Sequence, residues 1–535
     1  MRIVTPEEMR ELDFRAMSEY QISEEVLIER AGMSVARAGL ALLGKDSSRQ
    51  EGKKLLSVSG GGHNGADSLV ALRDLVSRGM SGAAILMETD PARQSEAVQR
   101  ELARLRALSV PILSCEDKGA RHRIMHAGLI MDGLLGTGFR GDLSNRHAQM
   151  IAEINRAGDA GIPVVSVDIP SGVDGLTGHV PTVAVKARVT VTFGAPKWGL
   201  LVDPGARYAG SVWISPIGFP PQLLAGGNRL CLTPVEAVGR LSKRFPAMHK
   251  GQAGHVLILG GSPGKTGAVL LAARGALRMG AGLVTVLWSD QFQGQAAGLP
   301  EVMGSYFSTS DAALARQSLL SAVSGKTAVA CGPGLELDTV SRTVLESLIR
   351  EYPGPLVADA GVFSFFAGKA DELARLRGGP LILTPHPGEL ARLMGIGIES
   401  VLKDPTRSAQ EASLRTSAIV LLKGARTIVA EPGGSLYVNM TGTSLMAGPG
   451  MGDVLTGMLV SLIGQGQDLF EAACLAAYLH GAVGNRTSNK GPSRGFLASE
   501  LADGIPELLA SWEQDLHPHL PTSDDPVYLW PTGVS

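Results

Sequence analysis

Residues 439–457 read NMTGTSLMAGPGMGDVLTG, the most informative stretch of the chain. The glycine-rich turn GPGMGD leads directly into an apolar segment, Val454 to Ile463, that is expected to be a helix. Bare backbone N–H groups at such a turn and helix start bind anions of phosphate size. Asp453 stands at the same helix start, where a carboxylate can act as a base beside the anion. A glycine-rich turn alone is compatible with a tight connection, but glycines, acid and helix in this order predict a nucleotide phosphate site.

The composition is that of a large globular α/β protein. The chain has 535 residues, of which 44% are hydrophobic and 19% charged, and its 68 glycines are scattered rather than periodic. At about 150 residues per domain, this length predicts two to four domains. The net charge of −2 gives no reason to expect nucleic acid or an anionic membrane as a partner.

Cysteine usage and the N-terminus predict a cytoplasmic protein. The cysteines are far apart and form no CxxC pair, which predicts buried thiols without a zinc or disulfide framework: Cys115, Cys231, Cys331 and Cys474. The first residues, MRIVTPEEMRELDFRAM, lack the apolar core of a signal peptide. No window reaches the ~18 apolar residues of a membrane span.

Short apolar runs alternate with segments of helical period, which predicts parallel sheets covered by helices. In the first half we expect a helix over 68–78 and strands at 55–58, 83–87, 129–131, 164–167 and 189–193. In the second half we expect strands at 255–259, 284–287, 328–330, 356–358, 381–383 and 419–422, and helices over 451–463, 469–481 and 497–512. The pattern breaks between 216 and 248, which predicts domains at 1–225 and 234–515, a linker at 226–233 and a loose tail at 516–535.

Polar side chains follow three glycine-flanked strand ends in the first half. The segment GGGHNGADS carries Asn64 and Asp67, and two further strands end in Asp132 and Asp168, with Ser171 close behind. Ligands of open α/β sheets lie beyond the carboxyl ends of the strands. Each motif alone is compatible with an ordinary turn, but their shared placement predicts one polar, anion-tolerant pocket.

The segment GGSPGKT, residues 260–266, resembles a P-loop but fails its spacing. A Walker A motif needs four residues between its first glycine and Gly-Lys-Thr. Counting back from Gly264 places Leu259 where that glycine must stand. We therefore expect a ligand loop instead, in which Gly267 and Ala268 are small enough to admit a flat ring.

Residues 1–225 resemble the epimerase domain of the bifunctional NAD(P)H-hydrate repair enzymes. The motifs that carry the resemblance are LIERAG (27–32), GTGFRG (136–141), DIPSGVDGLTG (168–178) and FGAPKWGL (193–200). The resemblance implies a Rossmann-like α/β/α domain that binds the hydrated dinucleotide through His63, Asn64, Gly65, Ala66, Asp67, Gly136, Thr137, Gly138, Phe139, Arg140, Gly141, Asp142 and Asp168. It also implies a potassium ion held by Asn64, Asp132 and Ser171, and proton transfer at C6 of the hydrated nicotinamide ring by Asp168.

The glycine loop departs from the family's pattern, GNNGGDG. This chain keeps Asn64 and Asp67 but has His63, Ala66 and Ser68, so that two glycines are lost. If either position needs a positive φ, the substitution strains the loop. These substitutions are the only support for a third class of function, a nucleotide-binding protein whose first domain has lost catalysis.

Residues 234–515 resemble the ADP/ATP-dependent NAD(P)H-hydrate dehydratases, which have a ribokinase-like α/β/α fold. The motifs are CGPGL (331–335), VADAGVF (357–363), LTPHPGELARL (383–393) and LLKGARTIV (421–429), followed by GPGMGD. Taken singly, His386 is compatible with a structural turn residue, Lys423 with a solvated strand end and Asp359 with a helix cap. The resemblance implies hydrate contacts by Ala268, Gly334, His386 and Asp453, and adenine-nucleotide contacts by Lys423, Gly424, Ala425, Arg426, Thr427 and Gly452.

Together the two resemblances imply repair of damaged NADH and NADPH. The first domain would interconvert the R and S hydrates, NADHX and NADPHX. The second would dehydrate the S form with ADP, or ATP, as co-substrate and Mg²⁺ as cofactor, with Asp453 as general base. ADP would be converted to AMP and phosphate, and a homo-oligomer is expected from the family. The alternative is a vitamin or sugar kinase, because kinases of this fold also place an Asp in a G-x-G-D loop.

Overall fold

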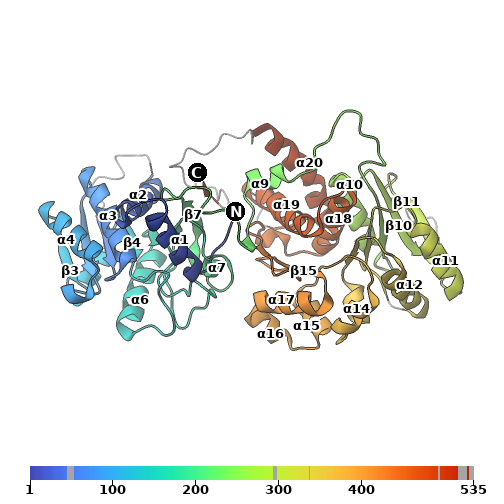
Figure 1. Cartoon of the computed structure of the whole chain (residues 1–535), viewed down its shortest axis with the longest axis horizontal. Helices are drawn as coiled ribbons and strands as arrows, with labels where there is room; N and C mark the ends of the chain where they lie inside the picture. Colours follow the sequence, from blue (N-terminus) through green and yellow to red (C-terminus); the bar gives the residue numbers. More distant parts are fainter. Residues whose placement is uncertain (45–53, 293–297, 337, 492–493, 516–526, 529–535) are drawn as a thin grey trace. The chain divides into compact units, whose positions relative to one another are not determined.

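The computed structural model describes residues 1–44, 54–292, 298–336, 338–491, 494–515 and 527–528 (Figure 1). It divides into two compact units. The N-terminal unit consists of Arg2–Gly227 and the short strand β18 (Val527–Tyr528), and the C-terminal unit consists of Met1 and the described residues from 228 to 515. Apart from β18, the segment predicted to be a loose tail lies outside the described residues.

The N-terminal unit contains an eight-stranded sheet in the order β18-β7-β6-β5-β4-β1-β2-β3, parallel except for the pairing of β18 with β7. Its strands besides β18 are β1 (Leu55–Ser59), β2 (Gly82–Leu86), β3 (Ile112–Ser114), β4 (Leu129–Gly133), β5 (Val164–Val167), β6 (Val189–Phe193) and β7 (Ser211–Ser215). The α-helices are α1 (Pro6–Ser18), α2 (Glu24–Leu43), α3 (His63–Ser77), α4 (Glu96–Ala107), α5 (Ala120–Met125), α6 (Asn145–Asp159), α7 (Trp198–Leu201) and α8 (Ala206–Ala209).

Alternating strand residues build two separate cores in this unit. Leu55 packs in the core under α1 to α4, whereas its neighbour Leu56 packs in the core under α5 and α6. Successive side chains of a strand point to opposite faces, so a strand that is buried on both faces needs apolar residues throughout. The result is a three-layer, Rossmann-like α/β/α unit, which confirms the expected fold.

The C-terminal unit contains a ten-stranded sheet in the order β11-β10-β9-β12-β13-β14-β15-β16-β17-β8, in which β16 runs antiparallel to both of its neighbours. The strands are β8 (Arg229–Leu230), β9 (His255–Leu259), β10 (Leu283–Ser289), β11 (Met303–Phe307), β12 (Ala328–Cys331), β13 (Leu356–Ala358), β14 (Leu381–Leu383), β15 (Ile419–Leu422), β16 (Ile428–Ala430) and β17 (Leu436–Val438).

Helices cover both faces of this second sheet, as expected for a ribokinase-like α/β/α unit. Figure 1 shows α10 and α18 to α20 on one side of the sheet and α14 to α17 on the other. The helices are α9 (Pro234–Gly239), α10 (Thr266–Arg278), α11 (Ala312–Val323), α12 (Thr339–Glu351), α13 (Gly361–Phe365), α14 (Ala370–Leu376), α15 (Pro387–Met394), α16 (Ile398–Lys403), α17 (Pro405–Thr416), α18 (Met451–Gly464), α19 (Leu469–Asn489) and α20 (Ala498–Asp515).

Every strand expected from the sequence is present, with ends shifted by no more than two residues. The expected helix start at 68 is wrong, because α3 already begins at His63. Helix α19 runs to Asn489, well beyond its expected end. The sequence missed seven short or edge strands, β3, β7, β8, β11, β16, β17 and β18.

The cysteine prediction is correct for three of the four thiols. All four are free, and Cys231, Cys331 and Cys474 are buried. Burial raises the pKa of Cys231 and of Cys331 to about 12, which keeps both thiols protonated. Cys115 is only half-buried, and its sulfur accepts a hydrogen bond from Arg146 Nε at 3.0 Å.

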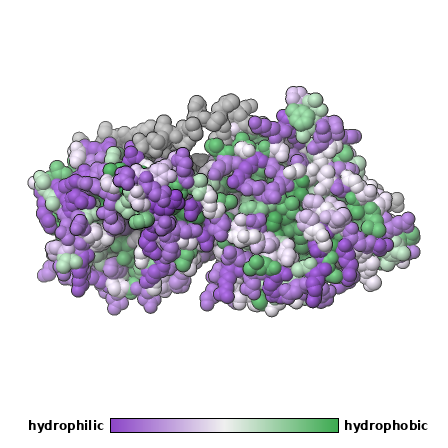
Figure 2. Space-filling model, viewed as in Figure 1, coloured by the Kyte–Doolittle hydropathy of each residue, from purple (hydrophilic) through white to green (hydrophobic). Residues whose placement is uncertain are grey.

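The surface seen in Figure 2 is mainly hydrophilic, with small hydrophobic areas scattered over it, as is usual for a globular protein. Among the helices of the described residues, none is long and apolar enough to cross a lipid bilayer.

Candidate active sites

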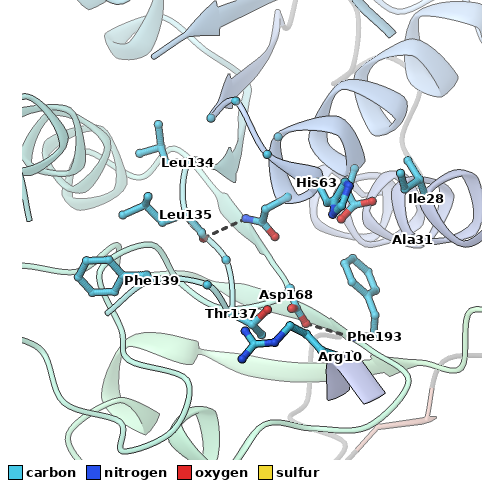
Figure 3. A pocket seen from close by; sticks show the side chains of 18 of the residues that line it. Arg10, Ile28, Ala31, His63, Leu134, Leu135, Thr137, Phe139, Asp168 and Phe193 are labelled. Atoms are coloured by element: carbon cyan, nitrogen blue, oxygen red, sulfur yellow. Dashed lines mark hydrogen bonds between the residues drawn. The ribbon is translucent and has the colours of Figure 1, made fainter. Parts of the chain in front are cut away.

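A cavity of about 1020 Å³ opens at the carboxyl ends of β1, β4 and β5 in the N-terminal unit (Figure 3). Its wall includes the turn 60–62, the start of α3, the turn 134–139 after β4, and Asp168 after β5. Residues of α1 and α2 complete the wall. This is the sheet edge at which the sequence predicted a polar pocket.

The glycine segment predicted to be a loop forms the first turns of α3. Gly62 caps the helix in an extended conformation, and neither Ala66 nor Ser68 has a positive φ. The loss of the family's glycines therefore does not strain the backbone. A glycine is needed at Gly65 instead, where a Cβ atom would lie 2.1 Å from the carbonyl oxygen of Gly60.

The hydroxyl group that Ser68 adds to this segment has partners on all sides. Its Oγ lies 3.0 Å from Ser57 Oγ and 2.8 Å from Ser59 Oγ, and it donates to the Gly65 carbonyl at 2.7 Å. All three serines are buried. Since a buried hydroxyl is costly only when it lacks hydrogen bonds, β1 accommodates the departure from the family's pattern.

The structure brings together the three residues predicted to hold potassium. Asn64 Nδ2 donates to the carbonyl of Leu135 at 3.0 Å, and the N–H of Leu135 donates to Ser171 Oγ at 2.9 Å. Ser171 Oγ in turn donates to Asp132 Oδ1 at 2.6 Å, and Ser166 Oγ donates to Asp132 Oδ2 at 2.7 Å. Asp132 is fully buried, and this burial raises its pKa.

Neutral hydroxyl and amide groups make the hydrogen bonds of Asp132. The buried carboxylate is thus solvated by dipoles, and its surroundings offer further amide, hydroxyl and carbonyl oxygens. Such a donor set suits a hard monovalent cation. In the described part of the chain, no three His, Cys, Asp or Glu side chains group together as a metal site.

Asp168 forms an ion pair with a lysine that was not predicted as a site residue. Its Oδ1 accepts hydrogen bonds from Lys197 Nζ at 2.6 Å, Thr192 Oγ1 at 2.9 Å and the N–H of Phe193 at 3.3 Å. The lysine is 1% exposed. Asp168 also has a positive φ of 63°, an uncommon conformation for a non-glycine residue, although aspartate adopts it more readily than most. The signal for Lys197 was its position as the one charged residue of FGAPKWGL.

The predicted dinucleotide contacts lie in three places. His63, Asn64, Gly65, Asp67, Gly136, Thr137, Gly138, Phe139 and Asp168 line the cavity. Ala66 is fully buried behind the wall. Arg140, Gly141 and Asp142 lie beyond the lining, where Arg140 donates to the Phe139 carbonyl at 2.7 Å and pairs with Glu7.

The second site lies at the carboxyl ends of β13 and β15, beside the start of α18. Lys423 Nζ is 2.8 Å from Asp359 Oδ1 and 3.7 Å from Glu389 Oε2. Thr456 Oγ1, on α18, donates to Asp359 Oδ2 at 2.7 Å. Asp359 and Lys423 therefore form a fixed pair rather than a helix cap and a solvated strand end. Glu389 was not predicted as a site residue, although it lies in the PHPGE motif.

Asp453 is partly buried in the first turn of α18. Burial is the main cause that raises its pKa to about 7, and the nearby carboxylates of Asp359 and Glu389 raise it further, against the effect of Lys423. A carboxylate with a pKa near the working pH is well suited to be a general base. Gly450 caps α18 with a φ of 84°, and a Cβ atom there would lie 2.5 Å from Leu271 Cδ1.

The remaining predicted residues of this unit lie in three places. Gly334 and Ala268 are neighbours, because a Cβ atom on Gly334 would lie 3.1 Å from the Cβ of Ala268. His386 caps α15, and its Nδ1 accepts the N–H groups of Gly388 and Glu389 at 3.0 and 3.4 Å. Residues 423–427 form the turn between β15 and β16, and a Cβ atom on Gly452 would lie 3.4 Å from Lys423 Nζ.

Comparisons with known proteins find matches to both units. A family model described as NAD(P)H-hydrate dehydratase matches residues 256–507, and one described as YjeF-related protein N-terminus matches residues 24–199. The bifunctional NAD(P)H-hydrate repair enzyme Nnr of Moorella thermoacetica is 37% identical over 526 residues, which cover 96% of this chain and 98% of that protein. The enzyme of the same name from Thermofilum pendens is 33% identical and covers 96% of this chain and 97% of its own.

A solved structure matches part of the chain. The ADP/ATP-dependent NAD(P)H-hydrate dehydratase from Bacillus subtilis, co-crystallised with ATP and Mg²⁺, is 29% identical, with a TM-score of 0.46, and covers 54% of this chain and 100% of its own. The family itself is established by the full-length relatives. The chain belongs to the family of bifunctional NAD(P)H-hydrate repair enzymes and combines an epimerase with a nucleotide-dependent dehydratase.

Proposed function

We propose that the cavity of the N-terminal unit interconverts the R and S hydrates of NADH and NADPH, and that the site beside α18 dehydrates the S hydrate. One observation carries this assignment: each unit has its own buried pair of an acid and a lysine at a sheet edge, Asp168 with Lys197 and Asp359 with Lys423. A cavity of about 1020 Å³ also has room for a dinucleotide.

In the N-terminal unit, the backbone N–H groups of residues 61–62 and 136–138 would bind the phosphates of the dinucleotide. Asp168 would transfer a proton at C6 of the hydrated ring. Asn64, Asp132 and Ser171 would hold potassium, which would balance the charge of the buried carboxylate and attract the substrate's phosphates. The neutral partners of Asp132 support this assignment.

In the C-terminal unit, Asp453 would take the proton of the C6 hydroxyl while that oxygen attacks the terminal phosphoryl group of ADP. Phosphorylation matters because hydroxide is a poor leaving group, whereas phosphate leaves readily from C6. Loss of a proton from C5 then completes the double bond of NADH or NADPH. The backbone at Gly450 and Gly452 would stabilise charge on the moving phosphoryl group.

The proposed function also implies a metal cofactor, a phosphoryl donor, a cellular location and an oligomeric state. Magnesium would neutralise the charge of the nucleotide's phosphates, and the carboxylates of Asp359 and Glu389 would supply oxygen ligands of the kind that it prefers. ADP rather than ATP is the proposed phosphoryl donor, by likeness to bacterial-type fused enzymes. A cytoplasmic homo-oligomer is the proposed form of the protein.

Absorbance at 340 nm tests the proposal directly. Purified protein is added to mixed R and S NADH hydrate with Mg²⁺ and ADP, and with ATP in parallel. Fast recovery of nearly all the NADH supports both activities. Recovery that stalls near half shows that the dehydratase works and that the cavity does not epimerise.

The kinase alternative gives a different product. A vitamin or sugar kinase would form a stable phosphorylated compound, whereas repair releases free phosphate together with NADH. No recovery of absorbance with either nucleotide would overturn the repair assignment for this chain.

A further inference from the structure

Helix α1 brings a further acid, which is half-buried, to the epimerase cavity. Asp13 lines the cavity together with Asp67, Asp168 and Lys197. Asp13 was not among the site residues expected from the sequence, and along the chain it lies far from every glycine motif. Figure 3 shows Arg10, three residues earlier on α1, on the same side of the cavity as Asp168.

The position of α1 is fixed next to the buried lysine. The N–H of Val4 donates to the Pro196 carbonyl at 3.0 Å, and the N–H of Trp198 donates to the Val4 carbonyl at 3.0 Å. These bonds flank Lys197 on both sides. Thr5 and Glu8 then form a capping box that starts the helix. These backbone hydrogen bonds thus fix the start of α1 beside Lys197, the residue that pairs with Asp168.

One face of α1 is buried in the core, and the adjoining face lines the cavity. Met9, Leu12 and Ala16 are buried in the core of the N-terminal unit. Asp13 and Phe14 line the cavity. Within the described residues, the Asp13 carboxyl has neither a hydrogen bond nor a close ion pair. It interacts only at longer range with the charges of other groups. Its oxygens are therefore available to a substrate.

The groups that face Asp13 come from three other elements. These are His63 and Asp67 on α3, Asp168 after β5 and Lys197 after β6, with Arg10 on α1 itself. Burial is the largest cause that raises the pKa of Asp13 to about 6, and Asp168 raises it further, whereas Lys197 and His63 lower it. The two acids thus differ in surroundings: Asp168 is paired with an ammonium group, and Asp13 is not.

We propose that Asp13 is the proton donor of the epimerisation and that Asp168 is the proton acceptor, an inference that rests on the proposed function of the cavity. Asp13 gives its proton to the C6 hydroxyl while the C6–O bond breaks, so that the oxygen leaves as water. The lone pair of the ring nitrogen N1 forms the N1=C6 double bond.

Water then returns to C6 from the opposite face of the ring. Asp168 takes a proton from this water as the new C6–O bond forms, and the electrons of the N1=C6 bond return to N1. The product is the other epimer, and no oxidant or reductant is consumed. A proton has moved from Asp13 to Asp168, and its return through solvent restores both groups.

Asp67 is a less suitable donor, although it also lines the cavity. Its side chain is only 7% exposed, and burial, followed by Asp168 and Asp13, raises its pKa well above the usual value. Asp67 is therefore less accessible from the cavity than Asp13, which is only half-buried. Asp13 is more exposed to the cavity, so that solvent can protonate it again after each turnover.

The test uses the full-length Asp13→Asn variant and pure R hydrate, with the R and S epimers separated by chromatography. We expect the epimerisation kcat to fall at least about 100-fold, in the range for loss of a general acid, with little change in KM. In the wild type, kcat should decrease as pH rises through about 6, because Asp13 must be protonated. This dependence should be absent from the residual activity of the variant. Asp13→Glu should restore part of the rate and the pH dependence.

Two controls separate chemistry from folding. Glu11→Gln changes an exposed acid on the same helix and should leave epimerisation unchanged. Dehydration of pure S hydrate by the C-terminal unit should be unaffected in all variants, and circular dichroism checks the fold. A folded Asp13→Asn variant with wild-type kcat and pH profile overturns the inference, whereas a wild type that does not epimerise at all overturns the proposed function of the cavity.

Discussion

Lys197 Nζ lies 2.6 Å from Asp168 Oδ1 in an ion pair whose lysine is almost completely buried. The same ammonium group also donates to Thr192 Oγ1 at 3.2 Å and to the Phe193 carbonyl at 2.9 Å. A buried ammonium is stable only when hydrogen bonds and an opposite charge replace its water. The pair therefore fixes both the charge and the position of the acid that is proposed to transfer a proton.

Replacement of the lysine should damage both stability and epimerisation. Lys197→Met leaves Asp168 without its cation, and removal of one partner of a buried pair costs about 3 kcal/mol. We expect the urea midpoint of the N-terminal unit to fall and epimerisation to drop at least about 100-fold, while dehydration of S hydrate persists. Lys186→Met, which removes an exposed lysine 3.4 Å from Asp159, is the matched control. Equal effects of the two substitutions would contradict the role given to Lys197.

Reversion of the altered glycine segment gives a second prediction. Ser68→Gly removes a buried hydroxyl from a cluster with Ser57 and Ser59 and places glycine inside α3. We expect the variant to be less stable by about 1 kcal/mol, because glycine is unfavourable within a helix. Epimerisation should stay within a few-fold of wild type. A large gain in epimerisation would show instead that the departure from GNNGGDG impairs catalysis.

The sequence predicted the sheets and the site edges well, because each rests on a local pattern. Runs such as 256–259 are buried on both faces and stand out as continuous apolar segments. Strands β16 (Ile428–Ala430) and β17 (Leu436–Val438) follow β15 with no helix between them, so the alternation of strand and helix that indicated the parallel strands is absent there. The start of α3 was missed because glycines in GGGHNGADS suggested a loop, although Gly62 only caps the helix.

Three site residues were not predicted from the sequence for a different reason. Asp13 lies more than a hundred residues from Asp168 along the chain, and no local motif distinguishes it from the other acids of α1. Lys197 becomes a site residue only through its burial against Asp168. Glu389 reaches Lys423 from another strand end. Such groups are brought together by tertiary packing, which a single sequence does not display.

A buried histidine in the C-terminal unit predicts how stability depends on pH. His480 Nε2 lies 3.0 Å from the Met451 carbonyl at the start of α18, and burial lowers the pKa of His480 to about 4. An unfolded histidine has a pKa near 6.5, so the unfolded chain binds a proton that the folded chain does not. The free energy of unfolding should therefore fall by about 3 kcal/mol as pH decreases from about 6.5 to about 4.

Urea unfolding of the C-terminal unit at several pH values checks this dependence. His480→Gln should remove most of the histidine's contribution, whereas His249→Gln, at an exposed position, should leave the wild-type slope intact. A wild-type slope retained in His480→Gln would show that another group dominates acid destabilisation.

Asp453 predicts the pH dependence of dehydration. A general base acts in its ionised form, and the pKa of Asp453 is raised to about 7 by burial, so kcat on pure S hydrate should rise with pH through about 7 and then level off. Asp453→Asn should lower kcat about 1000-fold, within the range for general bases, and abolish this rise. Epimerisation by the N-terminal unit of the same preparation reports on folding, and Glu399→Gln, an exposed acid of α16, should behave like wild type. If Asp453→Asn keeps the rise through about 7, another group is the base, and Glu389, which lies 3.7 Å from Lys423, becomes the next candidate.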